Sequence, residues 1–272
     1  MNRNIAVAMS VYKSDSANHV DLAIKSILNQ SLKDFHLYIE VDGTIDKSLS
    51  DLLKRYDTFK SITVNFNKSN KGLAYRLNQV IDKALETGRF NYIARMDADD
   101  ISAVDRFHTQ VEFLESNPDI SVVGSDVIEI DDNGTEIFYK KMDSNHIDLL
   151  SNVIKKCPLN HPSVMFRIEV FNECYRYQTE LKNTQDYYLW IDLLASGKKL
   201  ANINKPLLYF RVNNNFHSRR GFNKAMNDLR SRFYAFNKLH NISLSNIIHV
   251  ILLFGLRLSP NPLKKFAYKV MR

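Results

Sequence analysis

Short apolar runs alternate with amphipathic segments through the N-terminal third of the chain, and this alternation constrains the fold more than any other feature. Four apolar runs are typical of buried strands, namely 5–11, 35–41, 61–66 and 90–96. Segments 17–30 and 72–87 carry apolar residues at helical spacing. Strands that alternate with helices predict an α/β fold with a mostly parallel sheet and right-handed crossovers. The length of 272 residues fits one such domain with an appendage.

The second half of the sequence is more mixed. Segments 121–130 and 136–139 flank Asp131-Asp132-Asn133-Gly134, which predicts a β-hairpin. The remaining elements expected in this half are a strand at 163–167, a helix at 185–197 and a closing strand at 207–212. We find no internal repeat and no low-complexity linker.

The fourth apolar run ends in Asp97, Asp99 and Asp100, three carboxylates within four residues. Their repulsion and desolvation are costly unless a cation is present. Ligands of α/β sheets bind at the carboxyl ends of strands, and hard oxygen donors suit Mg²⁺ or Mn²⁺ holding a diphosphate. The pattern therefore favours a metal- and nucleotide-dependent enzyme, the alternative being a solvated acidic turn.

The C-terminal tail, residues 217–272, holds the whole excess of positive charge. It contains 11 Lys and Arg against one acid, Asp228, whereas the rest of the chain has 26 basic and 29 acidic residues. Such asymmetry indicates nucleic acid or an anionic membrane surface as a partner. The run 213–215 of three asparagines marks the expected boundary between a domain over 1–216 and this tail.

Within the tail, segment 242–258 is apolar but is interrupted by Asn246, His249 and Gly255. A bilayer-spanning helix needs roughly 20 apolar residues, so we expect a helix that lies in the membrane interface. The alternative is a helix packed on the domain or on a partner. Cys157 and Cys174 show no paired spacing, and the N-terminus shows no secretory pattern, so we expect reduced thiols and a cytoplasmic protein.

Several segments in order resemble inverting family 2 glycosyltransferases, which have the nucleotide-diphosphate-sugar-binding GT-A fold. The segments are 8–13, 23–31, 37–43, 70–78, 97–99, 161–166 and 184–190. Each match is weak alone, but their order makes the resemblance specific, and together they cover about residues 4 to 218.

The resemblance implies a UDP-sugar donor, bound by residues of the first four motifs and the acidic cluster. The residues implied in donor binding are Ser10, Tyr12, Asp42, Gly72, Asp97 and Asp99. Asp99 would be the direct metal ligand, and Asp97 would bind the ribose, or the metal through water. Asp42 would recognise the uracil ring and Tyr12 would stack on it. Each of three residues also has a structural explanation that needs no donor: Tyr12 as an aromatic residue in a turn, Asp42 as part of an Asp-Gly turn and Gly72 as the start of a helix.

Inversion requires a base that takes the proton of the acceptor hydroxyl. The resemblance places this base at Asp186, where Gln185 replaces the usual acidic neighbour. A helix N-terminus favours an ionised carboxylate, so Asp186 is expected to be ready at neutral pH. The alternative is that Asp186 only caps its helix.

On the acceptor side, His161 would contact an acceptor phosphate, the alternative being a structural loop histidine. Trp190 lies one helical turn beyond Asp186 on the same face and would form an acceptor platform, the alternative being core packing. The family often carries Arg-x-His after its last domain strand, and here the residues are Arg211-Val212-Asn213. His217 follows further on, and the departure puts in doubt a histidine contact to the metal or diphosphate at this point.

The sequence therefore predicts a cytoplasmic, membrane-peripheral hexosyltransferase. It would move glucose or galactose from a UDP-sugar to a lipid-linked saccharide, such as an undecaprenyl-diphosphate sugar, forming a β-linkage in O-antigen or capsule synthesis. One rival is a sugar nucleotidyltransferase, which should carry a Gly-rich loop after its first strand, absent from 9–15. The other rival is a non-catalytic basic module that binds nucleic acid. This rival does not explain the carboxylate cluster or Asp186.

Overall fold

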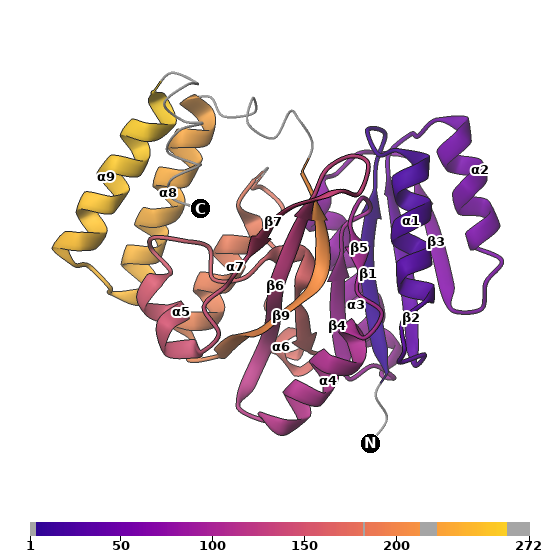
Figure 1. The fold of residues 1–272 in the computed structure, drawn as a ribbon, viewed down its shortest axis with the longest axis horizontal. Coiled ribbons are helices and arrows are strands. Elements are labelled where there is room, and N and C mark those ends of the chain that lie inside the picture. Colours follow the sequence, from indigo (N-terminus) through magenta and orange to yellow (C-terminus); the bar gives the residue numbers. More distant parts are fainter. Residues whose placement is uncertain (1–3, 182, 213–221, 260–272) are drawn as a thin grey trace.

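The computed structural model describes residues 4–181, 183–212 and 222–259 as a mixed α/β sheet flanked by helices (Figure 1). The strands are β1 Ile5–Val11, β2 Phe35–Asp42, β3 Ile62–Asn67, β4 Tyr92–Met96, β5 Ile101–Ser102, β6 Ile120–Ile130, β7 Glu136–Lys140, β8 Met165–Arg167 and β9 Lys199–Arg211. The α-helices are α1 Ala17–Leu28, α2 Lys47–Tyr56, α3 Leu73–Thr87, α4 Arg106–Ser116, α5 His146–Asn152, α6 Glu169–Asn172, α7 Gln185–Ala195, α8 Phe222–Leu239 and α9 Leu244–Leu258. A 3₁₀ turn, η1, covers His161–Ser163.

The sheet has the strand order β3-β2-β1-β4-β8-β6-β9-β5, with β7 paired to β6. Strands β1 to β4 run parallel, as predicted, with Met9 opposite Met96 and Val11 opposite Val41. Their carboxyl ends therefore meet at one edge of the sheet. Strands β5, β7 and β8 run antiparallel to their neighbours, so the sheet is mixed.

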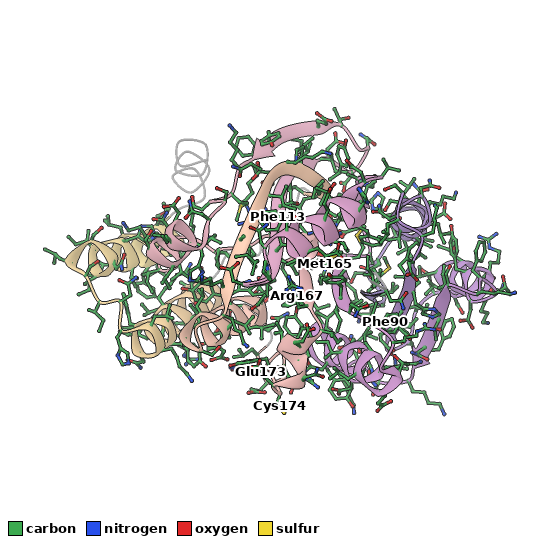
Figure 2. The ribbon with its side chains drawn as sticks, turned by 90° about the horizontal axis from the view of Figure 1, so that it is seen from below. Phe90, Phe113, Met165, Arg167, Glu173 and Cys174 are labelled. Carbon is green, nitrogen blue, oxygen red and sulfur yellow. The ribbon has the colours of Figure 1, made fainter. Side chains whose placement is uncertain are left out.

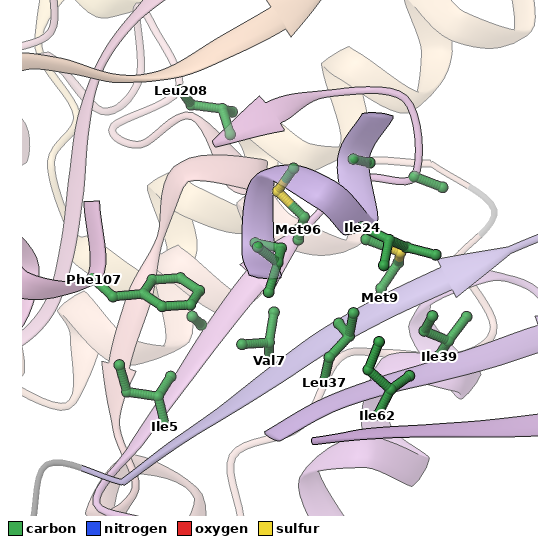
Figure 3. Packing of buried hydrophobic residues seen from close by; sticks show 14 of the residues in the cluster. Ile5, Val7, Met9, Ile24, Leu37, Ile39, Ile62, Met96, Phe107 and Leu208 are labelled. Carbon is green, nitrogen blue, oxygen red and sulfur yellow. The ribbon is translucent and has the colours of Figure 1, made fainter. Parts of the chain in front are cut away.

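Side chains of β1 alternate between two buried layers because helices cover both faces of the sheet. Ile5, Val7 and Met9 pack in the layer of α1, α2 and α4. Figure 3 shows them beside residues of β2 and α1. Ala6 and Ala8 face α3 in the other layer, where their small side chains let that helix approach the strand closely.

The predicted hairpin is present as β6 and β7, joined at Asp131–Gly134 and paired in antiparallel register. The closing strand, expected at 207–212, is instead the long β9, which starts at Lys199 and pairs with β6 along most of its length. Helices α2 and α4 and the short α5 and α6 are additions that the sequence reading did not predict. Strands β1 to β4 match their predicted bounds to within two residues.

The last two described helices extend the helical layer beyond α7. Helix α8 packs against α7 and α9 packs against α8 (Figure 1). Ala235, Phe236 and Val250 join the same core layer as α7. Figure 2 shows from below that the yellow and orange helices lie at the end opposite the violet α-helices of the N-terminal half. The expected boundary at 213–215 lies outside the described residues.

Candidate active site

A cavity of about 820 Å³ opens at the carboxyl ends of the parallel strands. Its lining includes every residue predicted to bind the donor, namely Ser10, Tyr12, Asp42, Gly72, Asp97 and Asp99. These residues are far apart in sequence and come together because β2, β1 and β4 are adjacent and parallel. The fold thus converts separate strand ends into one polar site.

Asp42, at the end of β2, is held in a fixed orientation by the turn before α3. Its Oδ1 accepts hydrogen bonds from the Lys71 amide at 2.8 Å and from Arg76 Nε at 2.7 Å. Its Oδ2 accepts one from the Gly72 amide at 2.9 Å, so this oxygen keeps a lone pair. The side chain is buried, and Arg76 neutralises its charge. Asp42 can therefore accept one further hydrogen bond from a ligand N–H without moving.

Gly72 closes the wall of the cavity beside Asp42. Its φ of 89° lies in a region that residues with a Cβ adopt at a cost, although no heavy atom lies within 4 Å of where a Cβ would be. The glycine is therefore required by backbone conformation and not by lack of space. It also begins α3, so both meanings proposed for it are compatible with the structure.

The loop after β1 presents Tyr12 at the rim, where the residue is 37% exposed. Its amide donates to Asp15 Oδ2 at 2.9 Å, which fixes the loop. Asp15 lines the same cavity and was not predicted as a site residue. Burial and the charges of Asp99 and Asp97 raise the pKa of Asp15 to about 7. The signal available in the sequence was an acid in the loop at a strand's carboxyl end.

The three carboxylates after β4 can supply oxygen atoms that all lie within 4.8 Å of one another. Asp100 is fully buried, and its Oδ2 has no hydrogen-bond partner. Burial and the neighbouring carboxylates raise the pKa of Asp100 well above its usual range and that of Asp99 to about 6. The unpaired oxygen and the crowded charges fit a divalent cation, for which carboxylates are the ordinary ligands. Asp100 thus joins Asp97 and Asp99 as a candidate ligand or supporting acid.

Arg211, the last residue of β9, ties the acidic turn to the β6–β7 hairpin. Its Nε donates to the Asp99 carbonyl at 2.8 Å and its Nη1 to the Asp131 carbonyl at 2.6 Å. Its amide donates to Asp100 Oδ1 at 2.8 Å. The guanidinium lines the cavity and supplies a positive charge beside the acidic cluster. Residue 213, where the family often has histidine, lies outside the described residues.

Asp186 lies in the first turn of α7, after Thr184, which begins the helix with a positive φ. Its neighbours Asn183 and Gln185 line the cavity. Burial raises the pKa of Asp186, against the lowering effects of the Tyr187 amide, its own amide and the Arg95 charge. The predicted effect of the helix N-terminus is therefore present, but burial outweighs it.

Arg95 connects the acidic cluster with the start of α7. Its Nη1 lies 2.5 Å from Asp97 Oδ1, and its charge acts on both Asp186 and His161. The guanidinium is buried, so its field is little screened by solvent. Arg95 therefore links the predicted base electrostatically to the acids that are predicted to bind the metal.

His161 and Trp190 are not among the residues lining the cavity. His161 Nε2 and the Tyr177 hydroxyl are 2.9 Å apart, and burial together with the Arg95 charge lowers the pKa of His161 well below its usual value. Trp190 has no exposed surface and stacks on Phe166 at 5.6 Å. Their positions correspond to the alternatives of a structural loop histidine and a core tryptophan. An acceptor platform would need an exposed ring face, which Trp190 lacks.

The comparisons with known proteins agree with this geometry. The sequence profile described as "Glycosyl transferase family 2" matches residues 6–174. The UDP-Gal:alpha-D-GlcNAc-diphosphoundecaprenol beta-1,3-galactosyltransferase of Escherichia coli is 28% identical over 97% of this chain and 94% of its own. The amylovoran biosynthesis glycosyltransferase AmsE of Erwinia amylovora is 28% identical over 83% of each chain.

Solved structures show the same fold at low sequence identity. The S. aureus TarS fragment 1–349 in complex with UDP has a TM-score of 0.65 and 14% identity, covering 92% of this chain and 70% of its own. The mannosyltransferase PcManGT from Pyrobaculum calidifontis, in complex with GDP-Man and Mn²⁺, has a TM-score of 0.60 and 13% identity, covering 100% and 80%. At these identities the likeness is evidence of the GT-A fold alone.

Proposed function

This chain belongs to glycosyl transferase family 2, and on that premise we propose that it transfers a hexose, glucose or galactose, from a UDP-sugar to a lipid-linked saccharide. The transfer would invert the anomeric centre and form a β-linkage in O-antigen or capsule synthesis. One observation carries the proposal: the Asp42–Gly72 turn and the carboxylate cluster line a single cavity. Family membership also removes the two rivals, a nucleotidyltransferase and a nucleic-acid-binding module.

On the donor side, each part of a nucleoside diphosphate has a matching group. Asp42 Oδ2 offers an acceptor for the N–H of a uracil ring, and the exposed Tyr12 ring offers a stacking surface. Asp97 and Asp99, with Asp100 behind them, would hold Mn²⁺ or Mg²⁺, which stabilises the charge of the departing diphosphate. Ser10 and Arg211 line the same cavity. Since the groups are held by hydrogen bonds before any ligand binds, little reorganisation is needed.

On the acceptor side, Asp186 would take the proton of the attacking hydroxyl. The new bond forms between that oxygen and the anomeric carbon as the bond from this carbon to the diphosphate oxygen breaks, and the electron pair leaves with UDP. Attack from the opposite face inverts the centre. Arg95 favours the ionised form of Asp186 that this role requires. The buried position of the carboxylate makes it a stronger base than an exposed one.

Residues 217–272 would place the enzyme on the inner face of the cytoplasmic membrane. Helix α9 packs inward through Val250, whereas Leu244, Ile248 and Ile251 on its outer side are exposed. The basic residues of this tail would add attraction to anionic lipids. No helix among the described residues is both long and apolar enough to cross a bilayer. Sedimentation with anionic and neutral vesicles tests this: we expect binding to anionic vesicles that salt weakens.

The function itself is tested by UDP release from a panel of UDP-sugars, with Mn²⁺ or EDTA and with or without a lipid-diphosphate-GlcNAc acceptor. We expect one donor to support metal-dependent release that the acceptor stimulates, with a β-linked product by NMR. An α-linked product would contradict inversion. No release with any donor, in an enzyme that binds UDP, would contradict the proposed donor or acceptor class.

A further inference from the structure

Two cations on the acceptor side of Asp186 have no carboxylate partner among the described residues. Lys140, the last residue of β7, donates from Nζ to Asn160 Oδ1 at 2.6 Å. Arg232, on α8, lies with its guanidinium 4.2 Å from the ring centroid of Tyr187, and its Nη1 donates a long hydrogen bond to the Val153 carbonyl at 3.5 Å. Its Nε is buried and lacks a partner. Neither residue forms an ion pair within the described ranges.

The two cations contact the same segment of the chain, Lys140 through Asn160 and Arg232 through the Val153 carbonyl, and Cys157 lies between these two contacts in the sequence. Burial raises the pKa of the Cys157 thiol to about 12, and the charges of Asp186, Arg232 and Lys140 all act on it. Tyr187, which Arg232 covers, follows Asp186 directly in α7. Lys140, Cys157, Asp186 and Arg232 each keep part of their surface open to solvent. Each of the two cations therefore keeps some surface that a ligand can contact.

Charges removed from water without a counter-charge are costly, and most buried cations in proteins are paired. Burial lowers the pKa of Lys140, which is the sign of this cost. Of the other cations near the site, Arg76 pairs with Asp42 and Arg95 with Asp97, whereas Arg211 donates to the carbonyls of Asp99 and Asp131. Lys140 and Arg232 are therefore two positive charges for which the described part of the chain supplies no counter-charge.

We propose that Lys140 and Arg232 form a subsite for the phosphate or diphosphate group of the acceptor. This rests on the proposed function, because it places the acceptor's anion beside Asp186 and away from the donor cavity, whose lining includes neither cation. Guanidinium and ammonium groups are the ordinary protein ligands of phosphate. The subsite takes over the phosphate contact expected from His161, whose lowered pKa makes its ring neutral.

The position of α8 supports a lipid-borne anion over a free one. Arg232 lies on the same helical hairpin as the exposed apolar side of α9, with Leu244, Ile248 and Ile251. An acceptor whose diphosphate contacts Arg232 would have its hydrocarbon chain close to this apolar surface. One element would then recognise both the charged and the apolar part of the ligand.

The test measures binding of decyl diphosphate to the full chain with the donor cavity saturated by UDP and Mn²⁺, which keeps the probe out of that cavity. We expect Lys140→Gln and Arg232→Gln each to weaken binding about tenfold, the range of one lost charge-assisted contact. Lys54→Gln, an exposed lysine on α2, is the charge-matched control and should bind as the wild type does. Decyl glucoside, which has no phosphate, should bind all variants equally.

Binding and transfer separate the two proposals. Wild-type binding that both substitutions weaken supports the subsite even if no sugar is transferred, and that outcome would contradict only the proposed function. The subsite is overturned if the wild type does not bind decyl diphosphate, or if Lys140→Gln and Arg232→Gln variants that keep UDP binding and the wild-type melting temperature bind it unchanged. Inorganic pyrophosphate that competes as well as decyl diphosphate would contradict the lipid contribution.

Arg232→Lys distinguishes recognition from packing. A lysine keeps the charge but loses the planar stack on Tyr187. We expect this variant to bind decyl diphosphate better than Arg232→Gln does. If both variants lose binding equally together with thermal stability, Arg232 acts as a packing residue, and that result contradicts its part of the subsite.

Discussion

The donor side and the proposed acceptor side of the site are built in different ways. On the donor side, the functional groups follow directly after β1, β2 and β4, three neighbouring parallel strands. Each group is fixed by local hydrogen bonds, as in the three bonds that hold Asp42. On the acceptor side, the groups come from β7, from the loop around Asn160 and from helices α7 and α8. These elements are far apart in the sequence and are joined by long-range packing and hydrogen bonds.

This difference explains what each side can recognise. Parallel strand ends form a rigid, polar edge, which suits a constant ligand such as a nucleoside diphosphate. Helices and loops on the other side can change without disturbing that edge, which suits a variable acceptor. Changes on the donor side should therefore remove binding and transfer together. Changes on the acceptor side should remove transfer and leave donor binding intact.

The largest effect is expected from Asp99→Ala. Losing this carboxylate weakens the metal site, so both UDP binding and transfer should fall below detection in calorimetry and in the UDP-release assay. Asp51→Ala, at an exposed helix position paired with Lys47, is the control and should behave as the wild type does. Full UDP affinity in Asp99→Ala would show that the donor side does not depend on this cluster.

A smaller effect is expected from Asp186→Asn, which keeps the shape and removes the base. Transfer should fall about 10³-fold, within the range for general base catalysis, while UDP affinity stays unchanged. The measurement pairs single-turnover transfer with UDP titration on the same preparation. Turnover close to that of the wild type would remove Asp186 from the base role and leave helix capping as its function.

The pH dependence of transfer should report Asp186 when the donor and metal are saturating. Burial raises the pKa of this carboxyl, and the base acts only when ionised, so the rate should be full at high pH and fall as pH decreases through that raised pKa. The acid limb should therefore lie above the usual Asp value of about 3.9. A rate constant that is flat down to that value would contradict the buried base.

Trp190 is expected to affect stability and not recognition. Trp190→Ala should lower the free energy of unfolding by about 3–5 kcal/mol, because the ring is fully buried against Phe166. Trp190→Phe should cost less and leave the acceptor KM unchanged. A raised acceptor KM with unchanged thermal stability would instead support the predicted role of Trp190 as an acceptor platform. It would contradict the assignment of Trp190 to the core.

The donor side could be predicted from the sequence because its information is local. Asp42 and Asp97 follow apolar runs whose length and burial identify them as strands, and adjacent parallel strands bring their ends together. Asp15 was missed because its only sequence signal, a lone acid in the loop after a strand, is weak; its environment depends on Asp97 and Asp99 after folding.

The acceptor side could not be predicted in the same way. Trp190 follows Asp186 by one helical turn, but only the packing of α7 on β8 shows that its ring is enclosed by Phe166. Likewise, Lys140 and Arg232 are far apart in sequence, and nothing local shows that both lie near Cys157.

One helix could have been predicted from the sequence but was not. Segment 47–56 is amphipathic, so the spacing of its apolar residues predicts the helix α2.

The central claim is that the strand ends form a metal-dependent site for a nucleoside diphosphate. Calorimetric titration of the purified chain with UDP, in Mn²⁺ and then in EDTA, tests it most directly. We expect UDP to bind in Mn²⁺ and to lose most of its affinity in EDTA, since the carboxylates of Asp97, Asp99 and Asp100 would then repel the diphosphate. No UDP binding in either condition, or equal binding in both, would contradict the account.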